Sequence, residues 1–367
     1  MANNMQNQYM PDYVSPPGET LLEALEAIGM TQADLADRTG RPRKTINKII
    51  RGKTSITPET ALQLERVLGT PARFWSNREQ HYRESLARAQ ERQKLQRQLD
   101  WLKQIPVKEM VAMKWLPAFE DTVDQLVAVV EFFGVTSPQQ WERIWMGTSV
   151  SFRQSPAFES NPGAVSAWLR KGELDARNID CQPYDEGKFR GSLEALRDLT
   201  TASPEEFVPK IQALCAQSGV AVVFVPELPK TRTSGGTRWL SPDKALIQLS
   251  LRYKRDDHLW FTFFHEAGHI LLHGKRDVFL EDNDVETEKE KQADKFSANF
   301  LIPPEEFAQF NPKAKHYSRL DVLDFAYEIG ISPGIVVGRL QRERLIGFSH
   351  LNDLKSPLAW ENIEGAN

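Results

Sequence analysis

The chain has 367 residues, of which 40% are hydrophobic and 26% charged, as is ordinary for a folded globular protein. This length predicts about two or three domains, and the composition excludes dominant disorder and collagen-like or low-complexity structure. No run approaches about 18 uninterrupted apolar residues, so we expect no membrane span. The polar N-terminus lacks a secretion signal, and two cysteines cannot build a disulfide scaffold. These features favour a cytoplasmic protein.

The net charge of −4 is distributed unevenly along the chain. Residues 1–104 hold 16 Lys/Arg and 12 Asp/Glu, a net charge of +4, and the remainder holds 30 and 38, a net charge of −8. A basic N-terminal part on an acidic body predicts an N-terminal module with an anionic partner.

After an N-terminus of residues 1–17 that we expect to be disordered or extended, residues 18–81 predict a bundle of short helices. Gly29, Gly40 and Gly52 end successive apolar-periodic runs, while Thr31 and Thr57 are suited to cap the helices that follow. Two short helices joined by a glycine turn match a helix-turn-helix. A solvated basic face on an ordinary helical bundle is the alternative interpretation.

The third helix of this bundle lies within a basic run, because residues 38–53 contain seven Lys/Arg and no acid. Polar and cationic side chains of this kind donate hydrogen bonds to phosphates and base edges. The predicted contacts with duplex DNA are Gln32, Arg41, Arg43, Lys44, Thr45, Asn47, Lys48, Arg51 and Lys53.

The string MTQADLADRTGRPRKTINKIIRGKTSITPETALQLERVLG, followed by PARFWSNREQHY, resembles the Cro/CI-type helix-turn-helix, and within it the HigA/VapI-type antitoxins. The resemblance covers about residues 15–85. It implies a homodimer that binds an operator, and a cognate toxin as a further partner.

The next segments predict further helices and then a small sheet. Residues 82–106, without Gly and with Pro only at their end, predict a helical linker whose helix spans 82–104, and residues 107–217 predict a helical middle region. Runs at 219–225 and 245–251 are rich in β-branched residues and predict strands of a C-terminal domain over 218–347, followed by a tail over 348–367. The expected fold class is mainly α and multi-domain: a five-helix helix-turn-helix bundle, a helical middle and a C-terminal α+β zincin-like domain.

The strongest local signal is the H-E-x-x-H string His265-Glu266-Ala267-Gly268-His269 within a mostly apolar helix, which we expect Asp256 or Asp257 to cap. Two histidines four residues apart share one helical face and can bind one zinc ion, whereas Glu266 can act on water as a catalytic base. A buried helix with two satisfied core histidines is the alternative. Gly268 suggests close packing against another element.

A third ligand is expected in the next predicted helix, which carries Glu290 and Asp294 on one face. Glu290 would bind the metal while Asp294 would contact a ligand histidine. His273, beyond the motif, would either contact a ligand histidine or serve only at the helix end. The spacing Thr287-x-x-Glu290 also fits a capping box, in which Glu290 would serve the helix terminus instead.

The string FTFFHEAGHILLH, followed by E-x-x-A-D-x-F-S-A-x-F-L-I-P, resembles the ImmA/IrrE zinc peptidase family over about residues 210–345. The resemblance implies that His265, His269 and Glu290 bind Zn²⁺, that Glu266 activates water, and that the substrate is a protein such as a repressor or antitoxin. Gln292 departs from the family pattern, in which a second glutamate is common, and this departure favours Glu290 as ligand.

The predicted function is therefore a DNA-binding regulator that carries a zinc-dependent endopeptidase. The strand predicted near residues 236–240 would hold an extended peptide by β-augmentation. The alternative is a non-cleaving antitoxin or repressor whose zinc domain senses or scaffolds.

Overall fold

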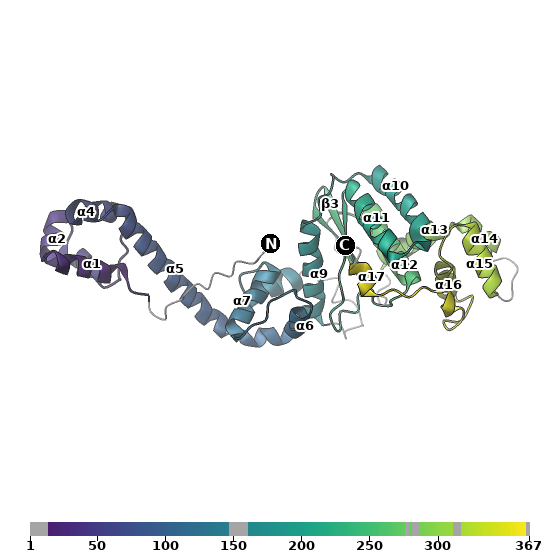
Figure 1. The fold of residues 1–367 in the computed structure, drawn as a ribbon, viewed down its shortest axis with the longest axis horizontal. Helices are drawn as coiled ribbons and strands as arrows, with labels where there is room; N and C mark the ends of the chain where they lie inside the picture. The colour runs from purple at the N-terminus through teal and green to yellow at the C-terminus, as the bar shows by residue number, and fades with distance from the viewer. Residues whose placement is uncertain (1–13, 147–160, 276–278, 281–286, 311–316, 365–367) are drawn as a thin grey trace. The chain divides into compact units, whose positions relative to one another are not determined.

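The computed structural model describes residues 14–146, 161–275, 279–280, 287–310 and 317–364 (Figure 1). The chain divides into two compact units, Met1–Gln98 and Leu99–Asn367. Of the N-terminus expected to be disordered or extended, residues 1–13 lie outside the described part, and Pro17 is already the first residue of a helix.

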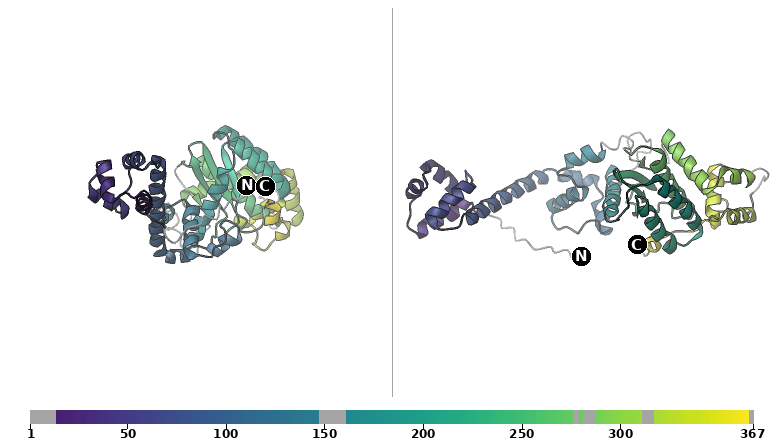
Figure 2. Two further views of the ribbon diagram at one scale, coloured as in Figure 1. Left: turned by 60° about the vertical axis from the view of Figure 1, so that its left-hand side comes forward. Right: turned by 90° about the horizontal axis from the view of Figure 1, so that it is seen from above.

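The first unit is a bundle of five helices, coloured purple to blue in Figures 1 and 2. Thr31 caps the second helix through a capping box with Asp34, and Thr57 caps the fourth, as the sequence predicts. Gly29, Gly40 and Gly52 all have positive φ, the conformation that suits glycine at a helix end. The helices are α1 (Pro17–Ala27), α2 (Gln32–Thr39), α3 (Arg43–Ile50), α4 (Pro58–Leu68) and α5 (Ala72–Gln96).

The prediction of a helix over 82–104 is wrong at both ends. Helix α5 begins directly after Pro71 and already contributes the fully buried Trp75 to the core of the first unit. It ends at Gln96, and Leu99–Gln104 form a separate 3₁₀ helix, η1. Because Pro71 is the last helix breaker before Pro106, the uninterrupted helix starts within the bundle rather than after it.

The second unit begins with helices around a cluster of aromatic residues. Trp101, Trp141 and Trp168 are buried, and Trp115 and Trp145 are partly buried. The helices are α6 (Val107–Ala112), α7 (Thr122–Phe133), α8 (Pro138–Trp141), the π-helical η2 (Glu142–Met146), α9 (Pro162–Arg177), α10 (Glu186–Arg197), the 3₁₀ helix η4 (Asp198–Thr201) and α11 (Pro204–Gln217).

A small mixed sheet follows, with the spatial order β1-β3-β2-β4. Strand β1 (Val220–Phe224) pairs in parallel with β3 (Lys244–Leu249), with Val220 opposite Ala245. Strand β2 (Gly235–Ser241) is antiparallel to β3 and also pairs with the two-residue β4 (Phe279–Leu280). The expected α+β architecture of the C-terminal region is confirmed.

Both faces of the sheet are buried, which explains the continuous apolar run of β1. Val220, Val222 and Phe224 belong to a core with α11 and α12 (Asp256–Leu272). Ala221 and Val223 pack on the opposite face with residues of α9. The first of these cores extends to the last described helices, so that part of the predicted C-terminal tail is buried: Ile363 of α17 (Trp360–Glu364) has no exposed surface.

The remaining helices follow α12 in the chain. They are α13 (Glu288–Leu301), α14 (Pro304–Phe310), α15 (Arg319–Glu328), α16 (Pro333–Arg342) and the 3₁₀ helix η5 (Asn352–Leu354). Within the described ranges, no helix has the length and apolar character needed to span a bilayer.

The expectation that Asp256 or Asp257 caps α12 is wrong. Both are buried inside the first turn, and Arg255 occupies the cap position without a side-chain hydrogen bond. The Asp256 carboxylate instead accepts hydrogen bonds from the Ser332 hydroxyl and from the Ser356 backbone N–H. These contacts hold α16 and the C-terminal segment against the start of α12.

Candidate metal centre

The H-E-x-x-H string lies in the C-terminal half of α12, and all five of its residues are buried. His265 and His269 are each 1% exposed, and Glu266 has no exposed surface. The Nε2 atoms of the two histidines lie 2.9 Å apart, because residues four apart stand one above the other on a helix.

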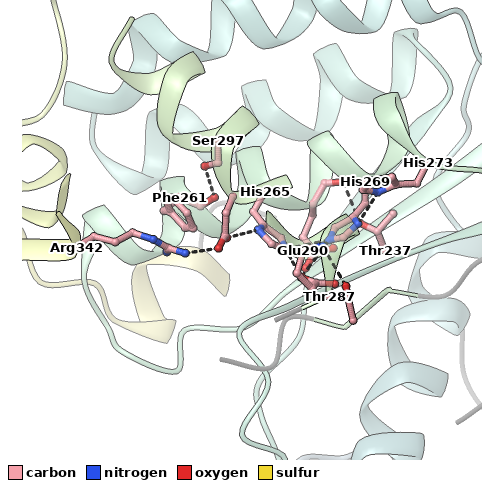
Figure 3. A network of polar contacts seen from close by, with 11 residues as sticks. Thr237, Phe261, His265, His269, His273, Thr287, Glu290, Ser297 and Arg342 are labelled. Carbon is pink, nitrogen blue, oxygen red and sulfur yellow. Dashed lines mark hydrogen bonds and ion pairs between the residues drawn. The ribbon is translucent and has the colours of Figure 1, made fainter. Parts of the chain in front are cut away.

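Helix α13 brings the third candidate ligand to this pair (Figure 3). Glu290 Oε2 lies 3.0 Å from His265 Nε2 and 3.5 Å from His269 Nε2, so that one atom from each of the three side chains falls within 4.8 Å of the others. The helices can approach because Gly268 faces α13. A Cβ at this position would lie 3.3 Å from Ala293 Cα and 3.0 Å from the Phe296 ring.

The protonation states suit a cation. Burial lowers the pKa of His269 to about 4, so its imidazole is neutral at neutral pH. Burial alone would raise the pKa of Glu290, but its hydrogen bonds with His265 and His269 lower the pKa to about 2, which keeps the carboxylate ionised. Two imidazoles and one carboxylate are a donor set that fits zinc with a further position left open.

Hydrogen bonds on the outer side of each histidine orient the rings. His265 Nδ1 lies 2.9 Å from Asp294 Oδ1, and Asp294 Oδ2 accepts from Arg342 of α16. Because a carboxylate only accepts, His265 donates its Nδ1 proton to Asp294, and its Nε2 faces Glu290 and His269. His269 Nδ1 contacts His273 Nδ1 at 2.9 Å, and His273 Nε2 lies 3.2 Å from Gln292 Oε1.

The rival capping-box interpretation of Glu290 describes only half of the geometry. The Thr287 hydroxyl does accept the Glu290 backbone N–H at 3.2 Å, and Thr287 is the N-cap of α13 (Figure 3). The Glu290 carboxylate, however, faces the histidines. The backbone of Glu290 therefore serves the helix terminus while its side chain remains available as a ligand.

Strand β2 runs directly past the motif glutamate. A Cβ at Gly235 would lie 2.7 Å from Glu266 Oε1 and 2.5 Å from Thr262 Cγ2, and the Thr237 hydroxyl donates to the Glu266 carbonyl at 3.3 Å. Only glycine allows this approach of strand to helix. Sequence reasoning missed Gly235; the Gly-Gly pair before a short β-rich run was the one available signal.

Among the residues that the structure describes, β4 pairs with the far edge of β2. Its Gly236 and Thr237 pair with β4, with Gly236 opposite Leu280. The peptide-binding strand predicted near residues 236–240 therefore already has a neighbour on that edge over its first two residues.

In the other unit, most of the predicted DNA contacts are solvent-facing. Arg43, Lys44, Lys48, Arg51 and Lys53 are exposed on or just after α3, while Ile46 and Ile49 of the same helix are buried. The other predicted DNA contacts are partly buried; they are Gln32, Arg41, Thr45 and Asn47. Arg41 also contacts Gln63 and forms an ion pair with Glu59 at 3.4 Å, which fixes it against α4.

Family models match both units. The helix-turn-helix model matches residues 21–75, and the peptidase M78 model, described as an IrrE N-terminal-like domain, matches residues 215–341. The chain thus carries a helix-turn-helix domain and a domain of the IrrE N-terminal-like family, which is a family of metallopeptidases.

Two solved structures are similar to part of this chain. An addiction module antidote protein of a HigA family from Coxiella burnetii is 32% identical, with 23% of this chain and 92% of that chain covered and a TM-score of 0.22. A putative antidote protein of a plasmid maintenance system from Nostoc punctiforme is 28% identical, with 23% of this chain and 91% of that chain covered and a TM-score of 0.22. No curated protein matches the chain.

Proposed function

We propose that this chain is a cytoplasmic DNA-binding regulator whose second unit is a zinc-dependent endopeptidase. The observation that carries the proposal is the juxtaposition of three features at one point of α12. They are the cluster of His265, His269 and Glu290, the buried Glu266 between the two histidines, and the glycine-lined start of β2 beside Glu266.

Each side chain has a distinct role in this proposal. His265, His269 and Glu290 would hold Zn²⁺, with Asp294 and His273 orienting the imidazoles. A bound zinc ion supplies Lewis acidity that lowers the pKa of water and polarises a peptide carbonyl. Glu266 accepts the proton of the attacking water and passes it to the leaving amine, the task of a general base and then acid.

The peptide substrate would lie in an extended form beside β2, where backbone hydrogen bonds are independent of sequence. The pairing of Gly236 and Thr237 with β4 affects where on β2 a substrate would bind. A substrate on the same edge must displace β4 where the two strands pair. Because the substrate and β4 would compete for the same edge of β2, we expect cleavage to be slow or to need a trigger. Such control also suits a peptidase that shares its chain with a DNA-binding module.

The first unit would dock α3 in the major groove of a two-fold operator as a homodimer, with the exposed cations of residues 43–53 on phosphates and base edges. A repressor or antitoxin is the proposed substrate. The sequence similarity to two antidote proteins favours a second candidate function, a non-cleaving antitoxin with a cognate toxin as partner.

The two functions differ in the fate of candidate substrates. We would express the wild type, Glu266→Gln and the matched surface control Glu288→Gln with added zinc, and analyse the chain and its genomic neighbours by mass spectrometry. Glu288 is exposed on the first turn of α13. If the second unit is an endopeptidase, we expect fragments with the wild type and Glu288→Gln but none with Glu266→Gln. The zinc content of all three proteins should be the same.

Identical fragments from the wild type and Glu266→Gln would assign the cleavage to contaminating proteases and contradict the peptidase. Complete absence of fragments under stress and added metal would favour the non-cleaving antitoxin.

A further inference from the structure

A second cavity, of about 210 Å³, lies within the second unit, and its lining includes none of the three candidate metal ligands. Its apolar floor is formed by the buried side chains of Leu301, Ile302 and Ile335. A cavity of about 150 Å³ with apolar walls is enough to bind benzene. This cavity therefore has room for a side chain of the size of leucine or phenylalanine.

The rim of the cavity carries exposed aromatic side chains. Phe348 is 75% exposed and Tyr253 is 41% exposed, and the Tyr253 ring stacks on the ring of His258 with their centroids 4.2 Å apart. His258 is exposed as well, so the cavity opens on the surface of the protein. Exposed aromatic side chains around a buried apolar floor are typical of a surface that binds an apolar group.

The lysine and arginine side chains of the lining are paired with carboxylates. The pairs are Lys355 with Asp257, Arg339 with Glu343, and Arg342 with Asp294. A charged group that entered the cavity would have to break one of these pairs to find a partner of opposite sign. The charges of the lining therefore favour an uncharged, apolar occupant.

The cavity adjoins the candidate metal centre. Phe261 belongs to the cavity lining, and its ring centroid lies 6.2 Å from that of His265. Arg342 also belongs to the lining and donates to Asp294, whose other oxygen contacts His265. Figure 3 shows Phe261 and Arg342 beside His265, on the side away from His273. The cavity thus continues the metal centre along α12.

The distance along α12 matches the spacing of side chains on an extended peptide. Phe261 and His258 precede His265 by four and seven residues, which is about 6 and 10 Å at about 1.5 Å per helical residue. An extended chain advances about 3.3 Å per residue. The start of β2 flanks the same stretch of the helix, because Gly235 lies against both Thr262 and Glu266. A peptide that passes the metal centre along α12 would therefore reach the cavity after two or three residues.

We propose that this cavity binds a large apolar side chain of the peptide substrate, two or three residues from the scissile bond. The proposal rests on the endopeptidase function proposed above and adds a substrate class to it. The substrate side chain, leucine or phenylalanine in kind, would pack on Phe261 and Ile335 while its backbone lies across the metal centre.

Cleavage of a mixed peptide library by the full chain tests the predicted preference. The library is a tryptic digest of a bacterial proteome, and mass spectrometry identifies the residues on both sides of each cut. We expect Leu, Phe, Ile and Met to be favoured over Ala by about tenfold or more at one position two or three residues from the cut, because the cavity would bury most of such a side chain.

Two variants assign this preference to the cavity. Ala298→Leu fills part of it and should lower the preference for Leu and Phe by about tenfold, while peptides with Ala at that position are cut as by the wild type. Phe348→Ala removes part of the rim and should lower the preference in the same direction. Tyr327→Ala removes a 91% exposed aromatic side chain of α15 outside the lining and should behave as the wild type. Thermal unfolding checks that each variant is folded.

A binding measurement tests the cavity without cleavage. The probes are two fluorescein-labelled heptapeptides of alanine and serine, one with Phe and one with Ala at the centre, and fluorescence anisotropy measures their binding to the Glu266→Gln chain. We expect the Phe peptide to bind more tightly by about tenfold or more. Adding Ala298→Leu to this chain should remove the difference.

The outcomes separate this inference from the function on which it rests. If the wild type cuts no peptide but the Glu266→Gln chain prefers the Phe peptide and Ala298→Leu removes that preference, the endopeptidase is contradicted and the cavity remains a peptide-binding site. Cleavage without an apolar preference two or three residues from the cut would overturn the inference and leave the endopeptidase intact. Equal binding of the two peptides, no binding of the Phe peptide at millimolar concentration, or an unchanged preference in both folded cavity variants would also overturn it.

Discussion

The orientation of His265 depends on residues from two other helices. Asp294 on α13 accepts a hydrogen bond from His265 Nδ1, and Arg342 on α16 donates to the other oxygen of Asp294. The Arg342 guanidinium also lies over the Phe261 ring at 4.4 Å. Outer partners of this kind fix the tautomer and the ring plane of a ligand histidine before any metal binds.

We predict that Asp294→Ala weakens zinc affinity by about 10- to 100-fold, the usual effect of losing such a partner. Arg342→Gln should have a smaller effect in the same direction, since it acts only through Asp294. Competition with a chromophoric chelator measures both affinities. Glu288→Gln removes an acidic side chain from the same helix away from the histidines, and it should leave zinc affinity unchanged.

Replacing Gly235 should disturb the approach of β2 to Glu266 without affecting metal binding. Gly235→Ala would place a methyl group 2.7 Å from Glu266 Oε1, so the start of β2 must move away from the carboxylate. We expect a loss of cleavage and a destabilisation of about 1–3 kcal/mol, at unchanged zinc content.

Gly191→Ala is the control for that change, because Gly191 is exposed in α10 and a Cβ there meets nothing within 4 Å. It should stabilise the protein by about 0.5–1 kcal/mol and leave cleavage intact. Full cleavage by a folded Gly235→Ala protein would show that the approach of β2 to Glu266 is unimportant.

At the scale of elements, local patterns predicted the helices and strands better than their contacts. The caps at Thr31 and Thr57, the run of β1 and the motif helix are short-range signals and are confirmed. The prediction that Gly268 packs closely on another element was also correct, but the partner, α13, depends on tertiary structure.

Long-range partners were beyond sequence reasoning for a physical reason. Arg342 contacts Asp294 across 48 positions in sequence, and Asp256 contacts Ser332 and Ser356 across 76 and 100. No local periodicity encodes such pairs. For the same reason Asp256 could be mistaken for a helix cap, since aspartate near a predicted helix start is the usual sign of one.

Helix α3 carries the prediction that concerns DNA. Replacing the exposed Arg43 and Lys44 together by alanine should weaken operator binding and flatten its salt dependence by about one unit of log–log slope for each DNA phosphate that the protein no longer neutralises. Fluorescence anisotropy at several salt concentrations measures both. A double variant with the same charge change in the second unit, Lys188→Ala with Lys210→Ala, should bind the operator as the wild type does. Unchanged slope and affinity in the Arg43 and Lys44 variant would reject the docking of α3 on DNA.

At the scale of the whole molecule, the chain joins a helix-turn-helix unit to a metallopeptidase-family unit. Each has its own core, with Trp75 buried in one and Phe263 in the other. We therefore expect changes at the metal site to leave DNA binding intact. The core of the second unit includes residues from Phe189 to Ile363. Helices that precede the strands in sequence and helices that follow them therefore share one hydrophobic core.

Whether His265, His269 and Glu290 bind zinc is decided by the zinc content of the purified full chain after dialysis against a weak chelator. We expect about one zinc per chain for the wild type and for Glu266→Gln, because Glu266 is not a ligand, and none for the double variant His265→Ala with His269→Ala. Circular dichroism would establish that the double variant is folded. Full zinc content in that folded variant, or a wild type that binds no zinc, would show that these residues do not form a zinc site.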